Sequence, residues 1–167
     1  MSPTPEIHTQ RLILEPVRSA HAEEAWPHVD DGRMWTYFTH LRPASILDLR
    51  RQYAKWERGS LAADQIWWNW ICRERTTGTL TGSMQTTVFP GEHVAYVAYA
   101  IYPENQRKGY AREAVRALIE RVRDTFGVTR FIAEMDTRNE PSYRLAERLG
   151  FARMQSRDGE FVYELNL

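Results

Sequence analysis

The chain has 167 residues and a mass of 19.6 kDa, with 43% apolar and 26% charged residues. A chain of this length can bury roughly 70% of the surface that its unfolded form exposes, so residues 1–167 can fold as one domain without disulfides. Its 22 Lys and Arg balance 22 Asp and Glu, 10 against 10 up to residue 80 and 12 against 12 beyond it. This neutrality argues against a broad basic face for nucleic acid or anionic lipid.

Three further observations narrow the class of protein. The single Cys72 cannot form an internal disulfide, and no Cys/His cluster has zinc-ligand spacing, so we expect no metal. The sequence contains neither a signal-peptide pattern nor a run of 18 apolar residues, so we expect a cytoplasmic protein that does not span a membrane. All six tryptophans fall within residues 26–70, which indicates that the two parts of the domain do different jobs.

The predicted elements form an α/β domain in which a mixed sheet carries helices on its faces. In chain order they are a strand, two helices, three strands, a helix, a strand, a helix and a closing hairpin, at residues 10–16, 19–28, 45–58, 66–75, 79–89, 93–102, 109–126, 130–136, 141–149 and 151–167. Ser45 with Asp48 is typical of a capping box at a helix start. The three middle strands have short connections, which predict antiparallel neighbours.

Two of these strands have informative patterns. Trp68 and Trp70 lie on one strand face and Trp67 on the other, and most such tryptophans pack in or near a core. The strand at 93–102 is apolar on both faces, which is typical of a central strand between two helical layers. A splay of this strand from its neighbour would leave backbone groups near Ile101 free.

The start of the helix at 109–126 is the most informative segment. A strand runs into Pro103, and a loop with two cations then leads to Gly109 and a long amphipathic helix. The first amides of a helix lack internal partners and carry the positive end of its dipole, so an anion bound there gains several donors. Glycine lets that backbone approach a ligand closely. The predicted ligand group is a phosphate or pyrophosphate, with Arg107, Lys108 and Arg112 beside it, and the alternative is an ordinary helix start with a solvated basic rim.

Two motifs together resemble the GNAT superfamily of N-acetyltransferases. The first, Gln106-x-x-Gly109-x-Ala111 after a strand and Pro103, is similar to its acetyl-CoA-binding motif. The second, Asn139-x-x-Ser142 ahead of Gly150-Phe151, is similar to the RimJ/RimL branch, which modifies protein N-terminal amines, and to its relatives acting on other amines. The resemblance implies the GNAT fold, a central, mostly antiparallel sheet flanked by helices on both faces.

The resemblance also implies a set of site residues. It implies that acetyl-CoA is held by Ile101, Gln106, Arg107, Lys108, Gly109, Tyr110, Ala111, Arg112, Asn139 and Ser142. Within this set the Ile101 amide would polarise the thioester carbonyl, Asn139 would hold the pantetheine arm, and Ser142 would lie beside the sulfur as catalytic acid. Many members use a tyrosine four residues after the position of Ser142, where this chain has Ala146.

The position of Ser142 on its predicted helix indicates where its hydroxyl points. Ser142, Ala146 and Leu149 share one helical face with Leu145, so the hydroxyl points toward the sheet. A buried hydroxyl needs a partner, and a bond back to its own helix is the structural alternative. Tyr143 is turned about 100° round the helix and is poorly aimed.

The acceptor is expected to be a small-molecule or peptide amine. Trp35, Tyr37 and Phe38 lie between the first two helices, where the resembled family builds its acceptor pocket, and Asp30 or Asp31 could attract an ammonium group. An amine attacks only when neutral, so a base is also needed. The candidate bases are Glu92, His93, Tyr96, Glu134 and Asp136.

The sequence therefore favours an acetyl-CoA-dependent N-acetyltransferase acting on a primary amine of a protein N-terminus or a small molecule. Two alternatives stay open, namely an enzyme of the same fold that modifies an amine antibiotic or a metabolite, and a catalytically silent acyl-CoA-binding module. Whether the chain forms a homodimer is also left open.

Overall fold

Eight strands form one sheet in the computed structural model, which describes residues 3–167. The strands are β1 (Ile7–His8), β2 (Leu12–Pro16), β3 (Ile66–Glu74), β4 (Leu80–Phe89), β5 (Val94–Ile101), β6 (Arg130–Asp136), β7 (Ala152–Arg157) and β8 (Glu160–Asn166). Their order is β1-β2-β3-β4-β5-β6-β8-β7, and all neighbours are antiparallel except β5 and β6. The predicted mixed, mostly antiparallel sheet is confirmed.

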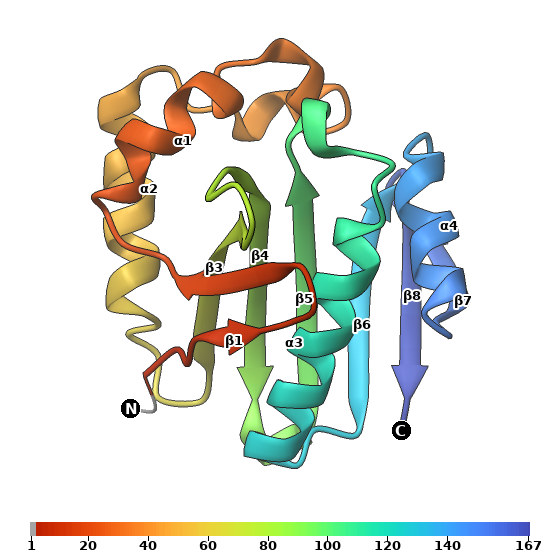
Figure 1. Cartoon of the computed structure of the whole chain (residues 1–167). Helices are drawn as coiled ribbons and strands as arrows, with labels where there is room; N and C mark the ends of the chain where they lie inside the picture. The colour runs from red at the N-terminus through yellow and green to blue at the C-terminus, as the bar shows by residue number, and fades with distance from the viewer. Residues whose placement is uncertain (1–2) are drawn as a thin grey trace.

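Four α-helices and four short 3-10 helices connect these strands (Figure 1). They are α1 (His21–Val29), η1 (Gly32–Trp35), η2 (Thr39–Leu41), α2 (Ile46–Arg58), η3 (Pro90–Glu92), η4 (Pro103–Asn105), α3 (Tyr110–Phe126) and α4 (Glu140–Arg148). The predicted α-helices are all present, with ends shifted by a few residues. The first predicted strand, 10–16, is instead the second half of a hairpin, because the Thr9 amide donates to Leu12 O at 2.9 Å and turns the chain.

The predicted cap of α2 is confirmed with one difference. Ser45 Oγ accepts a hydrogen bond from the Asp48 amide at 3.2 Å, as a helix cap does. The Asp48 carboxylate accepts the Ser45 hydroxyl proton at 2.8 Å, rather than a bond from the Ser45 amide. Asp48 therefore orients the capping oxygen.

The two faces of the sheet carry separate cores. Trp68 and Trp70, each 1% exposed, belong to the larger cluster with α3, and the Trp68 ring lies 4.6 Å from that of Phe126 between centroids. Ile71 belongs to the cluster beneath α1 and α2. Trp67 is half-buried. The predicted alternation of the tryptophans is confirmed, and the arrangement places α3 on one face and α1 with α2 on the other (Figure 1).

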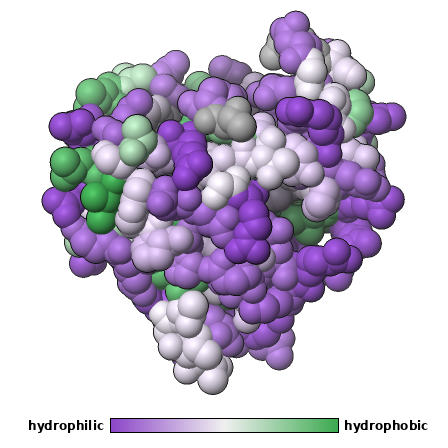
Figure 2. All heavy atoms as spheres, turned by 90° about the horizontal axis from the view of Figure 1, so that it is seen from above, coloured by the Kyte–Doolittle hydropathy of each residue, from purple (hydrophilic) through white to green (hydrophobic). Residues whose placement is uncertain are grey.

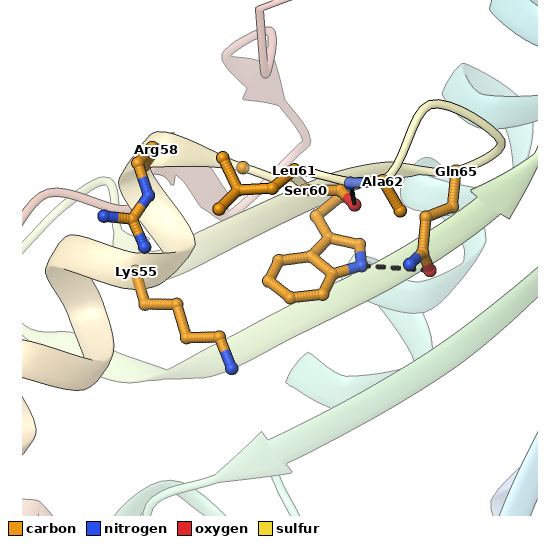
Figure 3. Close-up of a pocket in the computed structure, with 8 residues that line it drawn as sticks. Lys55, Arg58, Ser60, Leu61, Ala62 and Gln65 are labelled. Carbon is orange, nitrogen blue, oxygen red and sulfur yellow. Dashed lines mark hydrogen bonds between the residues drawn. The ribbon is translucent and has the colours of Figure 1, made fainter.

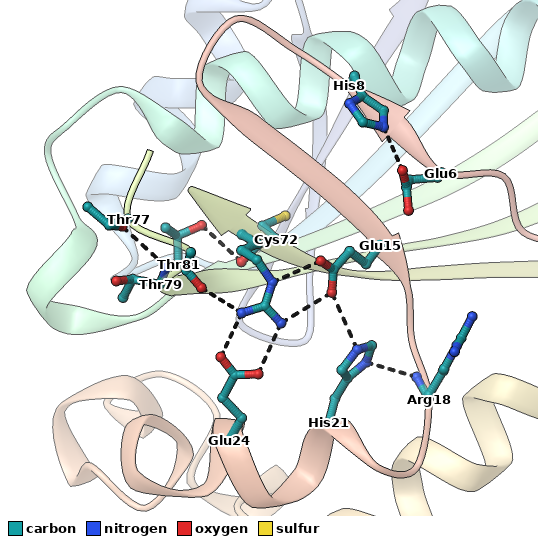
Figure 4. Close-up of polar contacts among 12 residues, drawn as sticks. Glu6, His8, Glu15, Arg18, His21, Glu24, Cys72, Thr77, Thr79 and Thr81 are labelled. Carbon is teal, nitrogen blue, oxygen red and sulfur yellow. Dashed lines mark hydrogen bonds and ion pairs between the residues drawn. The ribbon is translucent and has the colours of Figure 1, made fainter. Parts of the chain in front are cut away.

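An ionic cluster joins α1 to the sheet edge (Figure 4). The Arg73 guanidinium on β3 donates to Glu15 on β2 at 2.8 Å and to Glu24 on α1 at 2.6 Å. Both carboxylates hold the pKa of Arg73 above its usual range, with Glu24 contributing most. Because one guanidinium donates hydrogen bonds to both Glu15 and Glu24, the cluster fixes the position of α1 relative to β2 and β3.

His21 closes this cluster in a defined protonation state. Its Nδ1 accepts the Arg18 amide at 3.0 Å, and its Nε2 lies 3.4 Å from Glu15 Oε2. A nitrogen that accepts cannot carry a proton, so the ring is neutral with its hydrogen on Nε2. Burial lowers the pKa of His21, and the Glu15 charge only partly opposes this.

Acidification is expected to weaken the fold at His21. Because its pKa is lower in the folded protein, the neutral ring stabilises the fold above the ordinary histidine pKa of about 6.5, and this contribution is lost as the pH falls through the folded value. Urea unfolding of wild type and His21→Asn, whose Oδ1 can accept the same amide, should show a steeper loss in wild type from about pH 7.5 to about pH 5. If stability fell equally steeply with pH in the two proteins, the neutral state assigned to His21 would be wrong.

Candidate active site

The loop before α3 presents an open helix start. Arg107 and Gly109 have positive φ angles of 61° and 83°, and Gly109 is the residue that precedes the helix. Among the described residues no side chain caps α3, so the first amides of the helix face the loop without a partner from it. The geometry is that of an anion site, where several donors and the helix dipole converge.

The predicted cations surround this helix start. These cations, Arg107, Lys108 and Arg112, are all exposed, as is the neutral Gln106. The Lys108 Nζ donates to Asn105 Oδ1 at 3.3 Å, whereas Arg107 and Arg112 form no ion pair within residues 3–167. These two guanidinium groups are therefore available to a bound anion.

Tyr110 and Gln106 have structural contacts that the sequence does not indicate. The Tyr110 ring is 8% exposed and lies under the Arg11 guanidinium, 4.8 Å from its carbon, so this residue offers the site its backbone. Gln106 Nε2 donates to Ile101 O at 3.0 Å, which ties the loop to the end of β5.

The N-terminal hairpin holds the first turn of α3. Glu113 accepts hydrogen bonds from the Thr9 hydroxyl at 2.6 Å and the Arg11 amide at 2.7 Å, and it pairs with the Arg11 guanidinium at 2.7 Å. Burial opposes ionisation of Glu113, but these bonds outweigh it and lower its pKa. Arg11 also donates to Lys108 O at 2.9 Å, so one hairpin fixes both the helix and the loop before it.

The strands β5 and β6 pair over only part of their length. Their parallel register covers Val94 to Tyr96 on β5, and no pairing between them continues toward Ile101 in the described chain. The Tyr102 amide donates to Thr81 O on the β4 side at 2.9 Å. Because successive amides of a strand alternate, the Ile101 amide faces the β6 side, where the two strands have separated. The structure thus contains the splay that the sequence left as a condition for free backbone groups near Ile101.

Gly82 is a residue of this region that the sequence reasoning missed. A Cβ at Gly82 would lie 2.1 Å from Ala100 O and 2.9 Å from Ile101 Cα. Only glycine allows β4 to approach the end of β5 so closely. An isolated glycine inside a predicted strand is the signal that could have found it.

The start of α4 faces the same separation. Asn139 is 8% exposed, and its Oδ1 accepts the Ser142 amide at 3.3 Å. Ser142 Oγ donates to Tyr99 Oη on β5 at 3.1 Å rather than back to its own helix. The hydroxyl therefore points toward the sheet as predicted, and the structure brings Ile101, Asn139 and Ser142 to one region. Tyr99 was missed, because its position in an apolar strand indicates only packing.

A hollow of about 510 Å³ lies beside the start of α4. It is lined by Tyr37, Phe38, His40, Leu41, Asp136, Thr137, Arg138, Asp158, Gly159 and Glu160. Two of the three predicted aromatic residues thus line it. Trp35 does not, because its Nε1 donates to Val29 O at 2.6 Å and its ring packs against the α1 and α2 core.

Charge is unevenly distributed around this hollow. Arg138 donates to Asp136 and lowers the pKa of that carboxyl to about 2, which leaves Asp136 a weak base. Asp158 and Glu160 are exposed and have no ion pair in the described part of the chain. The aspartates expected to attract an ammonium group, Asp30 and Asp31, are paired with Arg42 and Arg33.

The remaining candidate bases lie in different places. His93, whose Nδ1 contacts Gly127 O at 3.0 Å, and Glu92 precede β5. They are about 26 Å from the Ile101 end at the usual rise per strand residue. Tyr96 is 39% exposed on β5 and Glu134 is exposed on β6.

A second, smaller pocket lies elsewhere. About 200 Å³ in volume, it is formed by the end of α2 and the start of β3, with the Lys55 ammonium 5.4 Å from the Trp67 ring centroid (Figure 3). None of its lining residues belongs to η4, α3, α4 or the end of β5. It is therefore separate from the candidate active site.

The surface and the helices restrict the class of site further. On the face seen from above, hydrophobic residues gather only in small separate groups between hydrophilic ones (Figure 2). Within residues 3–167, no helix has the length and apolarity to cross a membrane, and no three metal-binding side chains come together.

Comparison with known proteins identifies the family. Residues 11–152 match the family model described as Acetyltransferase (GNAT) domain. The chain belongs to the GNAT acetyltransferase family. A curated relative from Bacillus subtilis, the uncharacterized N-acetyltransferase YnaD, is 33% identical over 79 residues. That match spans about half of each protein, 47% of this chain and 46% of YnaD.

Solved structures of GNAT proteins share the whole fold. A putative ribosomal-protein-serine acetyltransferase from Vibrio cholerae is 25% identical with a TM-score of 0.83, and the match covers 100% of both chains. The ribosomal L7/L12 alpha-N-protein acetyltransferase RimL, solved in complex with coenzyme A, is 15% identical with a TM-score of 0.81 over 98% of both chains. These neighbours support the RimJ/RimL-like resemblance.

Gly109 offers a test of the helix start. Gly109→Leu should weaken coenzyme A binding at least 10-fold, because a side chain at φ 83° strains the backbone and its Cβ would lie 3.3 Å from Arg11 Nη2. Gly78→Leu is the matched control, since Gly78 has φ 73° and no atom within 4 Å of an added Cβ. Both variants should lose about 1–2 kcal/mol of stability. If calorimetry gave Gly109→Leu and Gly78→Leu the same affinity for coenzyme A, the start of α3 would not be the coenzyme A site.

Proposed function

We propose that this protein is an acetyl-CoA-dependent N-acetyltransferase that transfers the acetyl group directly to a primary amine. The observation that carries the proposal is the separation of β5 from β6 beyond Tyr96, which lies between the open start of α3 and Ser142 on α4. Membership of the GNAT family supports it.

The residues present fit acetyl-CoA as cosubstrate. The first amides of α3, with Arg107 and Arg112 unpaired beside them, suit the pyrophosphate. The outward backbone groups of Tyr99 and Ile101 can pair with the amides of a pantetheine arm laid along β5. RimL, which shares the fold, was solved in complex with coenzyme A. Acetyl-CoA supplies an acetyl group already activated as a thioester.

The chemistry then needs an oxyanion donor and an acid. The Ile101 amide, aimed away from β4, is placed to donate to the thioester oxygen as charge develops on it. The neutral amine forms the new C–N bond, and collapse of the tetrahedral intermediate breaks the C–S bond. Ser142 gives its hydroxyl proton to the departing thiolate, the proton released by the amine passes to solvent, and a proton from solvent is returned to Ser142.

The hollow beside α4 is the proposed acceptor site. Tyr37 and Phe38 offer aromatic surface, and Asp158 and Glu160 offer negative charge that no described side chain pairs with. An acceptor with an apolar or flat body and a protonated amine suits such a wall. Trp35 ties this wall to α1, because its Nε1 donates to Val29 O at 2.6 Å and its carbonyl oxygen accepts the Phe38 amide at 3.1 Å.

The acceptor class separates three versions of this function. RimL is an alpha-N-protein acetyltransferase of a ribosomal protein, which favours a peptide acceptor here. The small size of the hollow favours an amine metabolite or antibiotic equally well. A panel of peptides, polyamines and amine antibiotics, with coenzyme A release as the measurement, decides between them. Tight coenzyme A binding without release would indicate the silent module instead.

Ser142→Ala should leave the Kd for coenzyme A within about 2-fold, because the cap at Asn139 stays. Its kcat should fall by about 100-fold or more, the range for loss of a general acid. Stopped assays of coenzyme A release across pH provide the measurement. Turnover equal to wild type at every pH would exclude Ser142 as the acid.

Trp35→Ala should raise the acceptor KM, because the aromatic wall loses its support while the coenzyme A site is untouched. Phe38→Ala should raise it as well, since Phe38 lines the hollow directly. Trp67→Ala, in the separate pocket, is the matched control. An unchanged acceptor KM in Trp35→Ala would show that Trp35 does not support the acceptor site.

A further inference from the structure

The Tyr99 hydroxyl touches Ser142 at two atoms. It accepts the Ser142 hydroxyl proton at 3.1 Å and donates to the Ser142 carbonyl oxygen at 3.0 Å. Tyr99 lies on β5 and Ser142 on α4, 43 positions apart in the chain. These bonds cross the region where β5 and β6 no longer pair, so the position of the Ser142 oxygen depends on β5 as well as on its own helix.

The chemistry assigned to Ser142 needs such a partner. An alkyl hydroxyl is a far weaker acid than a thiol, so transfer of its proton to a thiolate is uphill when serine acts alone. A phenol, with an ordinary pKa of about 10, is much closer to a thiol at about 8.5. Burial raises the pKa of Tyr99, so its proton is present throughout the neutral range.

The face of α4 has room for this phenol. Ala146 lies one helical turn after Ser142 and is 1% exposed within the larger core cluster. Tyr99 packs against the same cluster from β5. Ala146 and Tyr99 thus share one core, and the Tyr99 hydroxyl reaches α4 at Ser142, one turn before Ala146.

We infer that Tyr99 is a positioning residue and proton relay for Ser142, an inference that rests on the proposed acetyl transfer. As the C–S bond breaks, its electron pair goes to sulfur, which takes the Ser142 hydroxyl proton. For this step both hydroxyl hydrogens first rotate, that of Ser142 from Tyr99 to the sulfur and that of Tyr99 from the Ser142 carbonyl oxygen to Ser142 Oγ. Ser142 then takes the phenol proton of Tyr99 in the same step, and the phenolate regains a proton from solvent, to which Tyr99 is partly exposed. No alkoxide accumulates on Ser142.

Tyr99→Phe tests the relay, because it removes one oxygen and keeps the ring in its packing. The kcat should fall at least about 10-fold, while the KM for acetyl-CoA and the Tm stay close to wild type. Tyr143→Phe is the matched control. It removes the same atom from the residue next to Ser142, and the Tyr143 hydroxyl has no hydrogen bond in the described structure, where its ring packs edge-on against Phe161.

Two further measurements separate a relay from packing. The double variant Ser142→Ala/Tyr99→Phe should be no slower than Ser142→Ala alone, because residues that act as a unit are not additive. Replacement of Tyr99 by 3-fluorotyrosine, whose phenol is more acidic, should move the alkaline limb of the kcat profile to lower pH. A structural role would leave that limb in place.

The outcomes distinguish the relay from the reaction that it serves. Coenzyme A release by wild type, with a slow Ser142→Ala and a Tyr99→Phe equal to wild type, would overturn the relay alone. Additive losses in the double variant, or a pH profile that 3-fluorotyrosine does not move, would also overturn it. No coenzyme A release by wild type with any amine would overturn the proposed function and the relay together.

Discussion

Beyond Tyr96, strand β5 is paired with β4 on one edge and has no strand partner within residues 3–167 on the other, and the candidate site depends on this unpaired edge. A backbone amide without a partner is costly when water is excluded, so strands rarely separate inside a sheet without a reason. Here the parallel pairing with β6 ends at Tyr96, whereas the antiparallel pairing with β4 continues to Ile101. The unpaired groups are therefore donors and acceptors in fixed directions, which is what an extended ligand with amide groups requires.

The same divergence places the two helix starts. The chain leaves the end of β5 through η4 into α3, and it leaves the end of β6 directly into α4. The two helices therefore begin on either side of the separated strands, with Gly109 at one start and Asn139 at the other. The uncapped start of α3 and the start of α4, which carries the Ser142 hydroxyl, face one gap. This follows because α3 connects β5 to β6, and these two strands separate beyond Tyr96.

Local patterns predicted much of this arrangement. Gly109 and the three-and-four spacing behind it indicated where α3 begins, and Pro141 after Asn139 indicated α4, because helix starts are encoded within a few residues. Where two strands stop pairing is not encoded in that way. An isolated glycine marks a close approach at Gly82 but not its partner Ala100, and no spacing within one segment reveals the contact of Tyr99 with Ser142. Trp35 illustrates the same limit, since its turn toward Val29 depends on how η1 folds against α1.

The hairpin contacts of Glu113 bear on how the protein folds. Glu113 bonds to Thr9 and Arg11, residues 104 and 102 positions earlier in the chain. Contacts of such long range close late, because the entropy of a large loop must be lost before they form. During synthesis the N-terminal hairpin can make these bonds only after about two thirds of the chain has been made, so the start of α3 is fixed late. Until α3 docks, the Trp68 ring also lacks its contact with Phe126, so the tryptophan core and the start of α3 are completed together.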